Sequence, residues 1–179
     1  MNKDIWIISD HHFSHANMCK FTNYDGSKVR PWTDVNEMDE AMINSWNSVV
    51  KDWDKLYHLG DFSMGWKELP GKVMGRLKGR KRLVRGNHDM CPTSEYMKYF
   101  EDIYGVRVFS ESKLIFSHYP LHAESIKEGW LNVHGHLHDN YVKMKNGLAD
   151  PRYFNVSVER INYTPIHFDE LAAMVNKIT

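Results

Sequence analysis

Five short apolar segments of this sequence each run directly into aspartate, asparagine or histidine. The segments span residues 5–8, 56–59, 82–85, 114–116 and 131–133. They are followed, in order, by Asp10-His11-His12, Gly60-Asp61, Gly86-Asn87-His88-Asp89, His118 and Gly135-His136-Leu137-His138. Apolar runs of this length bounded by glycine or aspartate are typical of buried strands. Since ligands bind beyond the carboxyl ends of such strands, the pattern predicts two carboxylates, an amide and several imidazoles in one cavity, which is a metal site.

Helices are predicted between several of these strands. Asp34 and Glu37 have the spacing of a capping box at the start of a helix that runs to about Val50. Its apolar positions recur every three or four residues, as on one helix face: Val35, Met38, Met42, Trp46 and Val49. Shorter helices are predicted over residues 72–77 and from Asp169 onward, the last burying Leu171, Val175 and Ile178.

Two more strands are predicted over residues 154–158 and 165–168, and a hairpin joins residues 106–109 to residues 113–116. Helices that alternate with strands predict an α/β fold in which helices cover both faces of the sheet. The chain has 179 residues and lacks low-complexity segments and linkers, so we expect one domain spanning residues 1–179.

Composition narrows the classes of protein that this chain could represent. Lys and Arg together number 23 and equal Asp and Glu, which argues against a non-specific nucleic-acid coat protein because the chain has no overall positive field. Two cysteines, Cys19 and Cys91, are too few for a disulfide framework. The N-terminal apolar run covers only residues 5–8, too short for a signal peptide or a membrane span. We therefore expect a cytoplasmic protein with no membrane partner.

The order D-x-H, G-D, G-N-H-D, H and G-H-x-H resembles the signature of the calcineurin-like metallophosphoesterase superfamily. Here the motifs span residues 10–138, and the sequences around them resemble those of the short, capless bacterial and phage-type phosphoesterases. The resemblance implies an α/β fold in the form of a four-layer αββα sandwich, with two mixed sheets flanked by helices. It also implies an enzyme that hydrolyses phosphoric esters at a binuclear metal centre.

Carried over by motif position, the resemblance implies a role for each residue. The implied metal ligands are Asp10, His12 and His138 for one ion, Asn87, His118 and His136 for the other, and Asp61 as the bridge. His88 would be the general acid or a clamp on the phosphate, and Asp89 would orient the His88 ring. Two bridged metals lower the pKa of a shared water, so the attacking group would be a metal-bridging hydroxide.

The donor set also restricts the identity of the metal. Four imidazoles, two carboxylates and one amide, without a thiolate, favour two divalent transition-metal ions. Manganese is the first expectation, and iron, zinc, cobalt or nickel would also suit these ligands. A calcium site would contain more oxygen donors, and a structural zinc site usually contains cysteine.

Several residues outside the motifs are candidate substrate contacts. His15 and Asn17 lie in the loop after the first motif, and His122 follows His118. Arg30 is a candidate phosphate contact, with Arg152 as an alternative.

Other residues are expected to be structural. His58 and His134 lie in apolar strands and are predicted to be hydrogen-bonded core residues, and His11 is predicted to point away from the metals. The basic run between Lys78 and Arg85 is interpreted as a solvated turn before a strand, in preference to a nucleic-acid patch.

The sequence-based hypothesis is a phosphodiesterase that acts on nucleotide or nucleic-acid-like substrates. A capless site is open and suits diesters and extended substrates. A phosphomonoesterase with the same site, a metal-free scaffold or binding module, and a metal-dependent regulator that binds a nucleotide without cleaving it are the alternatives. The sequence does not specify the oligomeric state.

Overall fold

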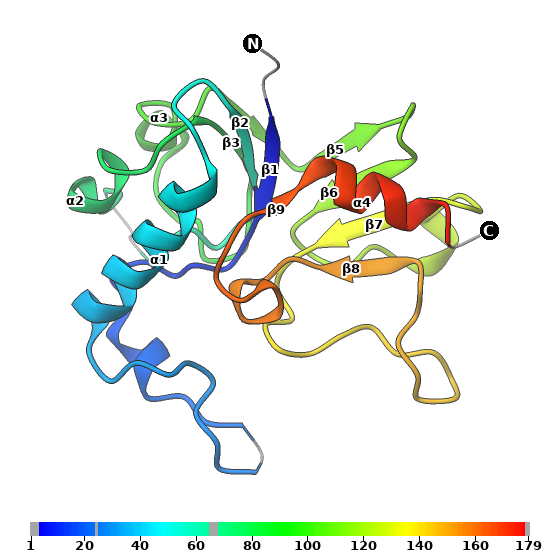
Figure 1. Cartoon of the computed structure of the whole chain (residues 1–179), viewed down its shortest axis with the longest axis horizontal. Helices are drawn as coiled ribbons and strands as arrows, with labels where there is room; N and C mark the ends of the chain where they lie inside the picture. Colours follow the sequence, from blue (N-terminus) through cyan, green and yellow to red (C-terminus); the bar gives the residue numbers. More distant parts are fainter. Residues whose placement is uncertain (1–3, 24, 65–67, 178–179) are drawn as a thin grey trace.

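Two mixed β-sheets pack face to face in the computed structural model, which describes residues 4–23, 25–64 and 68–177 (Figure 1). Within these residues the first sheet has the strand order β4 (Asp102–Tyr104), β3 (Arg80–Val84), β2 (Lys55–His58), β1 (Ile5–Ile8) and β9 (Ile166–His167). Strands β1 to β4 are parallel, and β9 is antiparallel to β1.

The described part of the second sheet has the order β5 (Val106–Phe109), β6 (Leu114–Ser117), β7 (Leu131–His134) and β8 (Tyr153–Asn155). The predicted hairpin is formed by β5 and β6, which are antiparallel, whereas β6, β7 and β8 are parallel. Both sheets are therefore mixed, as predicted.

Helix α1 (Val35–Val49) covers one face of the first sheet. Its Met38, Met42 and Trp46 side chains are fully buried in the same cluster as Ile8 and Leu56 of the sheet. The Asp34 carboxylate accepts hydrogen bonds from the amides of Asn36 and Glu37, so the helix begins where the sequence predicts. The shorter helices α2 (Gly71–Met74) and α3 (Thr93–Tyr96) contribute to this cluster through Val73, Met74 and Tyr96.

The opposite face of the first sheet packs against the second sheet. Ile7 and Val84 share a buried cluster with Phe116 and Val133 of the second sheet. Helix α4 (Phe168–Val175) adds Leu171 and Val175 to this cluster and packs against β1, β6 and β9. The fold of two mixed sheets with helices is thus confirmed, whereas Ile178 of the predicted last helix lies outside the described residues.

Some elements differ from the prediction. Strand β4 and helix α3 were not predicted, and α2 ends three residues before the predicted limit at residue 77. Strand β8 ends at Asn155 because the chain turns into the 3₁₀ helix η3 (Val158–Ile161). Two more 3₁₀ helices in the described ranges are η1 (Ala16–Cys19) and η2 (Ala123–Ser125). No described helix has both the length and the apolar character that crossing a bilayer requires.

Candidate metal centre

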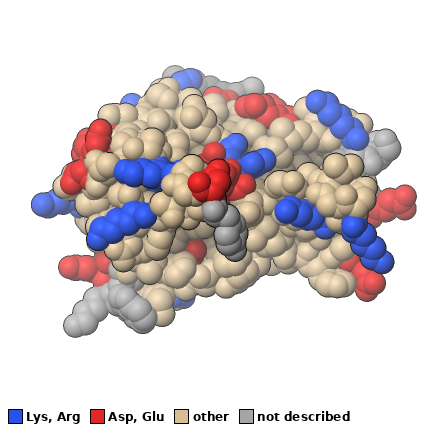
Figure 2. Space-filling view, turned by 90° about the horizontal axis from the view of Figure 1, so that it is seen from below, with Lys and Arg blue, Asp and Glu red and all other residues tan. Residues whose placement is uncertain are grey.

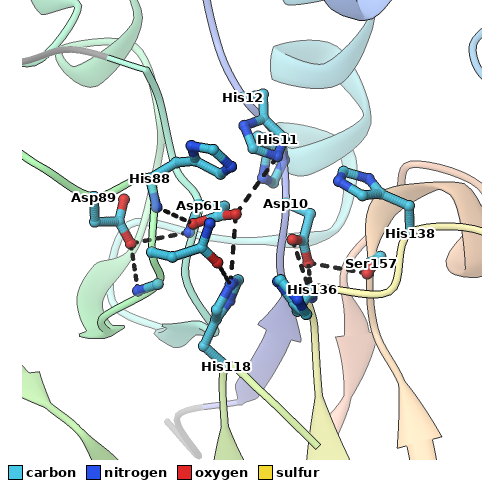
Figure 3. A network of polar contacts seen from close by, with 12 residues as sticks. Asp10, His11, His12, Asp61, His88, Asp89, His118, His136, His138 and Ser157 are labelled. Carbon is cyan, nitrogen blue, oxygen red and sulfur yellow. Dashed lines mark hydrogen bonds and ion pairs between the residues drawn. The ribbon is translucent and has the colours of Figure 1, made fainter. Parts of the chain in front are cut away.

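The loops that follow β1, β2, β3, β6 and β7 meet at the carboxyl ends of these strands (Figure 3). Backbone hydrogen bonds join the loops directly. The Asp10 amide donates to the carbonyl of Gly60 at 3.0 Å, and the His12 amide donates to the carbonyl of Asp61 at 3.1 Å. The Gly135 amide donates to the carbonyl of His118 at 3.0 Å. Hydrogen bonds of the main chain therefore hold these loops together at the edge where the sequence predicts that they meet.

Two groups of metal-binding side chains result. Asp10, His12 and His138 form the first group, and Asp61, His118 and His136 form the second. Within each group one ligand atom per residue lies within 4.8 Å of the others. The first group is one of the ligand sets implied by the sequence, and the second contains His118 and His136 of the other set together with Asp61, the implied bridge. The role of each residue as a ligand stays a prediction.

Asp61 lies between the two groups. Its Oδ2 atom is 3.4 Å from Nε2 of His118 in its own group and 3.7 Å from Nε2 of His12 in the other. Its Oδ1 atom accepts a hydrogen bond from the His88 amide at 2.8 Å. One oxygen is thus fixed by the backbone while the second faces an imidazole from each group, the position that a bridging carboxylate requires.

The imidazoles are held in orientations that suit metal binding. Nδ1 of His118 lies 2.8 Å from the Leu59 carbonyl, which can only accept, so this nitrogen carries a proton and Nε2 is the atom that faces the centre. Nδ1 of His138 is similarly 3.2 Å from Oε1 of Glu159. Both ring nitrogens of buried His12 lack a hydrogen-bond partner among the described residues. Since buried polar atoms are nearly always paired, a metal ion bound at Nε2, the nitrogen that faces Asp61, would account for one of these two atoms.

The backbone at these positions is strained. Five of the residues in the two groups have the left-handed conformation that side chains other than glycine rarely adopt, namely Asp10 (φ 60°), His12 (φ 50°), Asp61 (φ 55°), His136 (φ 69°) and His138 (φ 49°). Such strain costs of order 1–3 kcal/mol per residue and concentrates at functional sites. The clustering therefore marks this region as functional independently of the side chains.

Two motif glycines allow the loops to approach this closely. A Cβ atom on Gly86 would collide with the Asp61 carboxylate and backbone, and one on Gly135 would collide with the Asp10 carboxylate and with Ser9. The G-N-H-D and G-H-x-H motifs therefore contain glycine because a carboxylate of a neighbouring loop occupies the space of the side chain.

The protonation states also fit a metal centre. Burial raises the pKa of Asp10 to about 6, against the lowering effect of His138 and His118, and a nearby cation would favour its ionised form. Burial also raises the pKa of Asp61, but the hydrogen bond and charge of His118 outweigh it and leave a pKa of about 2. Burial lowers the pKa of His12 well below its ordinary value. Asp61 is thus a carboxylate and His12 a neutral imidazole, the forms that bind metals.

Two residues of the G-N-H-D motif, Asn87 and His88, lie beside different ligand groups. The Asn87 side-chain oxygen lies 2.9 Å from Nε2 of His118, beside the second group. The half-buried His88 ring packs edge-on against His12, with 5.3 Å between the ring centroids, and is directed toward the first group (Figure 3). Their roles as a metal ligand and as a general acid or phosphate clamp stay predictions.

The prediction that Asp89 orients the His88 ring is wrong. The Asp89 carboxylate is buried and accepts hydrogen bonds from the amides of Asp61 (2.9 Å), Phe62 (3.0 Å) and Gly86 (2.8 Å). The dashed lines from its oxygens in Figure 3 lead to main-chain nitrogens and not to the His88 ring. Asp89 therefore positions the loop that carries Asp61, and the catalytic assignment fails because its oxygens are occupied by backbone donors.

Arg30, predicted to contact the substrate phosphate, is buried instead. Its side chain is 1% exposed, and its NH1 and NH2 groups donate to the carbonyls of His11 and Asp10, each at 2.6 Å. Its NH2 group also lies 2.8 Å from Oε1 of Glu159. With these donors committed to buried protein groups, Arg30 fixes the loop of the first motif and is not placed to contact a substrate phosphate.

Glu159 was missed by the sequence analysis. Its side chain is 3% exposed and links Arg30 to His138. Ser157, also overlooked, donates a 2.9 Å hydrogen bond from Oγ to Asp10. The signal was available, because Glu159 follows the predicted apolar strand over residues 154–158 in the same way that the motif residues follow theirs.

The other substrate candidates lie at different distances from the centre. His15 is half-buried, 6.1 Å from the His12 ring between centroids, whereas Asn17 is exposed on η1. His122 is exposed and accepts a hydrogen bond from the Glu124 amide at the start of η2. Arg152 forms an ion pair with Asp150. None of the described contacts joins Asn17, His122 or Arg152 to the two groups, and their substrate roles stay predictions.

The histidines expected to be structural are so. His11 stacks on Phe13 and lies 2.8 Å from His58 through ring nitrogens. Nδ1 of His134 lies 2.7 Å from the Gly135 carbonyl. Burial lowers the pKa of His58 to about 3 and that of His134 to about 4, so both are neutral core residues.

The basic run is neutralised locally. Arg80 and Arg82 form ion pairs with Glu101, and Lys81 donates to the carbonyls of Leu77 and Gly79. On the face shown in Figure 2, basic and acidic side chains are interspersed. The interpretation of the run as a solvated turn is wrong for most of it, because Arg80, Lys81 and Arg82 lie within strand β3 and only Lys78 precedes the strand.

Two mixed sheets with two groups of carboxylate and imidazole side chains at the ends of their strands support assignment to the metal-dependent phosphoesterases. The chain belongs to the calcineurin-like phosphoesterase family, whose model matches residues 3–172. It is 33% identical over 179 residues to the uncharacterized protein MJ1445 of Methanocaldococcus jannaschii, covering 98% of this chain and 93% of that protein. The Gene 66 protein of Mycobacterium phage D29 is 24% identical over 206 residues, covering 98% and 97%. A solved structure, the protein of unknown function AQ665 from Aquifex aeolicus, has a TM-score of 0.68 and 26% identity, covering 97% of this chain and 100% of that one.

Proposed function

We propose that this protein is a phosphodiesterase that holds two divalent transition-metal ions, manganese first among them. The observation that carries the proposal is the position of Asp61, whose Oδ2 atom faces Nε2 of His12 and Nε2 of His118. A carboxylate that faces an imidazole from each of two ligand groups is placed to bind two ions at once. When bound, such a pair lowers the pKa of a shared water and neutralises charge on the phosphoryl oxygens.

The first ion would be held by Asp10, His12 and His138, and the second by Asn87, His118 and His136, with Asp61 between them. Nitrogen and oxygen donors without thiolate suit manganese and its neighbours in the first transition series. The two Nδ1 hydrogen bonds of His118 and His138 fix the ring orientations, which is the usual support for a metal-binding histidine.

His88 is the proposed general acid. Its backbone amide is fixed by Asp61, and its ring is half-buried beside His12, so the imidazole can approach a bound ester from the side of the first group. Protonation of the leaving oxygen by a positioned imidazole contributes roughly 10²–10⁴-fold to the rate.

The test is hydrolysis of bis(p-nitrophenyl) phosphate beside p-nitrophenyl phosphate, after chelation and then addition of Mn²⁺. Faster metal-restored cleavage of the diester supports the proposal. Faster cleavage of the monoester would keep the metal chemistry and show a phosphomonoesterase. Absence of cleavage with Mn²⁺, Fe²⁺, Zn²⁺, Co²⁺ or Ni²⁺ would contradict the proposal and favour a scaffold or binding module.

A further inference from the structure

A hollow of about 450 Å³ adjoins the candidate metal centre, and the function proposed above does not use it. It lies between the segment that contains η1 and the loop after it and the segment that follows β7. Its lining includes His138, which belongs to the first ligand group, so the hollow and the centre share a wall. The volume is within the range of roughly 300–1,000 Å³ that is common for pockets that bind small molecules.

The walls of the hollow are chemically mixed. Met18, Phe21 and Val29 provide apolar surface, while Asn23 and Asn140 bring side-chain amides, each of which offers hydrogen-bond donors and an acceptor. The Phe21 side chain is 48% exposed, so its ring is accessible to a planar group that enters the hollow.

The charge of the lining does not favour a phosphate as the occupant. The described residues that line the hollow include no lysine or arginine, and Asp139 contributes a carboxylate. The lining therefore offers no lysine or arginine to an anionic phosphate, and its Asp139 carboxylate is paired with Arg160, whereas a neutral planar group with polar edges would be accommodated.

We propose that this hollow binds the nucleobase of a nucleotide ester whose phosphate lies at the metal centre. The proposal rests on the proposed function, because it places the phosphate beside His138. The base stacks on Phe21 and its polar edge meets the Asn23 and Asn140 side chains, as expected for a base held between an aromatic ring and hydrogen-bonding groups.

His15 supports this placement. Its ring lies 6.4 Å from Phe21 on one side and 6.1 Å from His12 on the other, between centroids. A nucleotide that spans from Phe21 to the centre would pass the half-buried His15 ring, which agrees with the predicted substrate contact of His15.

The test compares adenosine 5′-monophosphate with ribose 5-phosphate, which differ only by the base. Binding to the protein in the presence of Mn²⁺ is measured by calorimetry. We expect the nucleotide to bind about 5- to 150-fold more tightly, the ratio that corresponds to stacking of one base. Phe21→Ala should bring this ratio toward one, and Phe21→Tyr should preserve it because the ring remains.

Two exposed aromatic residues serve as controls. Trp53 is 44% exposed and lies before β2, at the end of the first sheet opposite the centre, so Trp53→Ala should leave the ratio unchanged. Tyr119 is 50% exposed and its ring is 4.4 Å from that of His136, in the second group. Collapse of the ratio in Tyr119→Ala but not in Phe21→Ala would overturn the proposal by placing the base on the other side.

Equal affinity of the wild-type protein for the two phosphates would also overturn the inference, even if the protein cleaves diesters. Conversely, nucleotide binding that depends on Phe21, in a protein that cleaves neither nitrophenyl ester with any metal, would support the hollow as a base site and contradict the proposed function. The two proposals can therefore fail separately.

Discussion

Arg30→Met should destabilise the protein strongly, although the arginine touches no substrate in our proposal. The guanidinium is 1% exposed and is shared between Glu159 and the carbonyls of Asp10 and His11. Removing one partner of a buried ion pair costs about 3–5 kcal/mol, because the remaining charge is left uncompensated. Each carbonyl that loses its donor adds about 1–3 kcal/mol unless water reaches it. We therefore expect a loss of at least about 3 kcal/mol out of the roughly 5–15 kcal/mol typical of a folded domain.

The assay is urea unfolding of the metal-free protein, so that bound ions do not mask the effect. With an m-value of about 2 kcal/mol per M, a loss of 4 kcal/mol lowers the midpoint by about 2 M. Arg76→Met is the matched control, because Arg76 forms a similar two-pronged pair with Glu40 on the surface, where solvent screens it. We expect the control midpoint to stay close to that of the wild type.

The double variant Arg30→Met/Glu159→Met tests the cause. If the unpaired Glu159 carboxylate produces the loss, the double variant is more stable than the sum of the two single variants predicts. Strictly additive losses would refute the argument from the buried charge. An Arg30→Met midpoint as high as that of Arg76→Met would refute the structural role of Arg30 altogether.

Four further predictions concern the centre itself. Asp61→Ala should abolish hydrolysis and reduce Mn²⁺ binding below two ions per chain; a fully active variant with two ions, measured by elemental analysis, would exclude the bridging role. His88→Ala should keep both ions and slow esters with poor leaving groups most, and equal slowing across a leaving-group series would indicate phosphate binding instead of acid catalysis. Complete chelation should lower the melting temperature, because ligands that bind only the folded state stabilise it, and an unchanged melting temperature would contradict this. Gly86→Ala should lower both stability and Mn²⁺ affinity, since the added methyl group collides with Asp61, and wild-type values in calorimetry would show that the loops can separate without cost.

The sequence predicted the main features of the fold and the centre because local signals and long-range geometry agree there. An apolar strand of about four residues can be recognised from its own sequence, and the carboxyl ends of parallel strands lie at one edge of a sheet. Asp10, Asp61 and His118 could therefore be assigned to one site without knowledge of the contacts. Strand β4 was missed because Asp102–Tyr104 is only three residues long and half-buried, with little apolar pattern.

Asp89 and Arg30 were misassigned for a common reason. A charged residue beside a motif can serve the substrate or the main chain, and only the fold shows which partner is within reach. Asp89 lies beside three backbone amides and Arg30 beside two backbone carbonyls, so the hydrogen-bonding groups of both side chains are occupied by the loops. Glu159 follows an apolar strand as the motif residues do, but its partners are 129 and 21 residues away in sequence, and this local signal does not identify them.

The buried hydrogen bonds and ion pairs of Asp89, Arg30 and Glu159 explain how the strained backbone of the centre is held in place. Left-handed conformations at Asp10, His12, Asp61, His136 and His138 cannot be relieved by glycine, because each position needs a side chain that reaches the centre. The strain must therefore be offset by bonds that hold the loops in place from outside. Asp89 supplies them to the loop of Asp61, and Arg30 with Glu159 supplies them to the loop of Asp10 and to His138. A variant that removes these anchors should thus lose metal affinity even when every ligand remains, because the freed loops would relax toward unstrained conformations that separate the two groups.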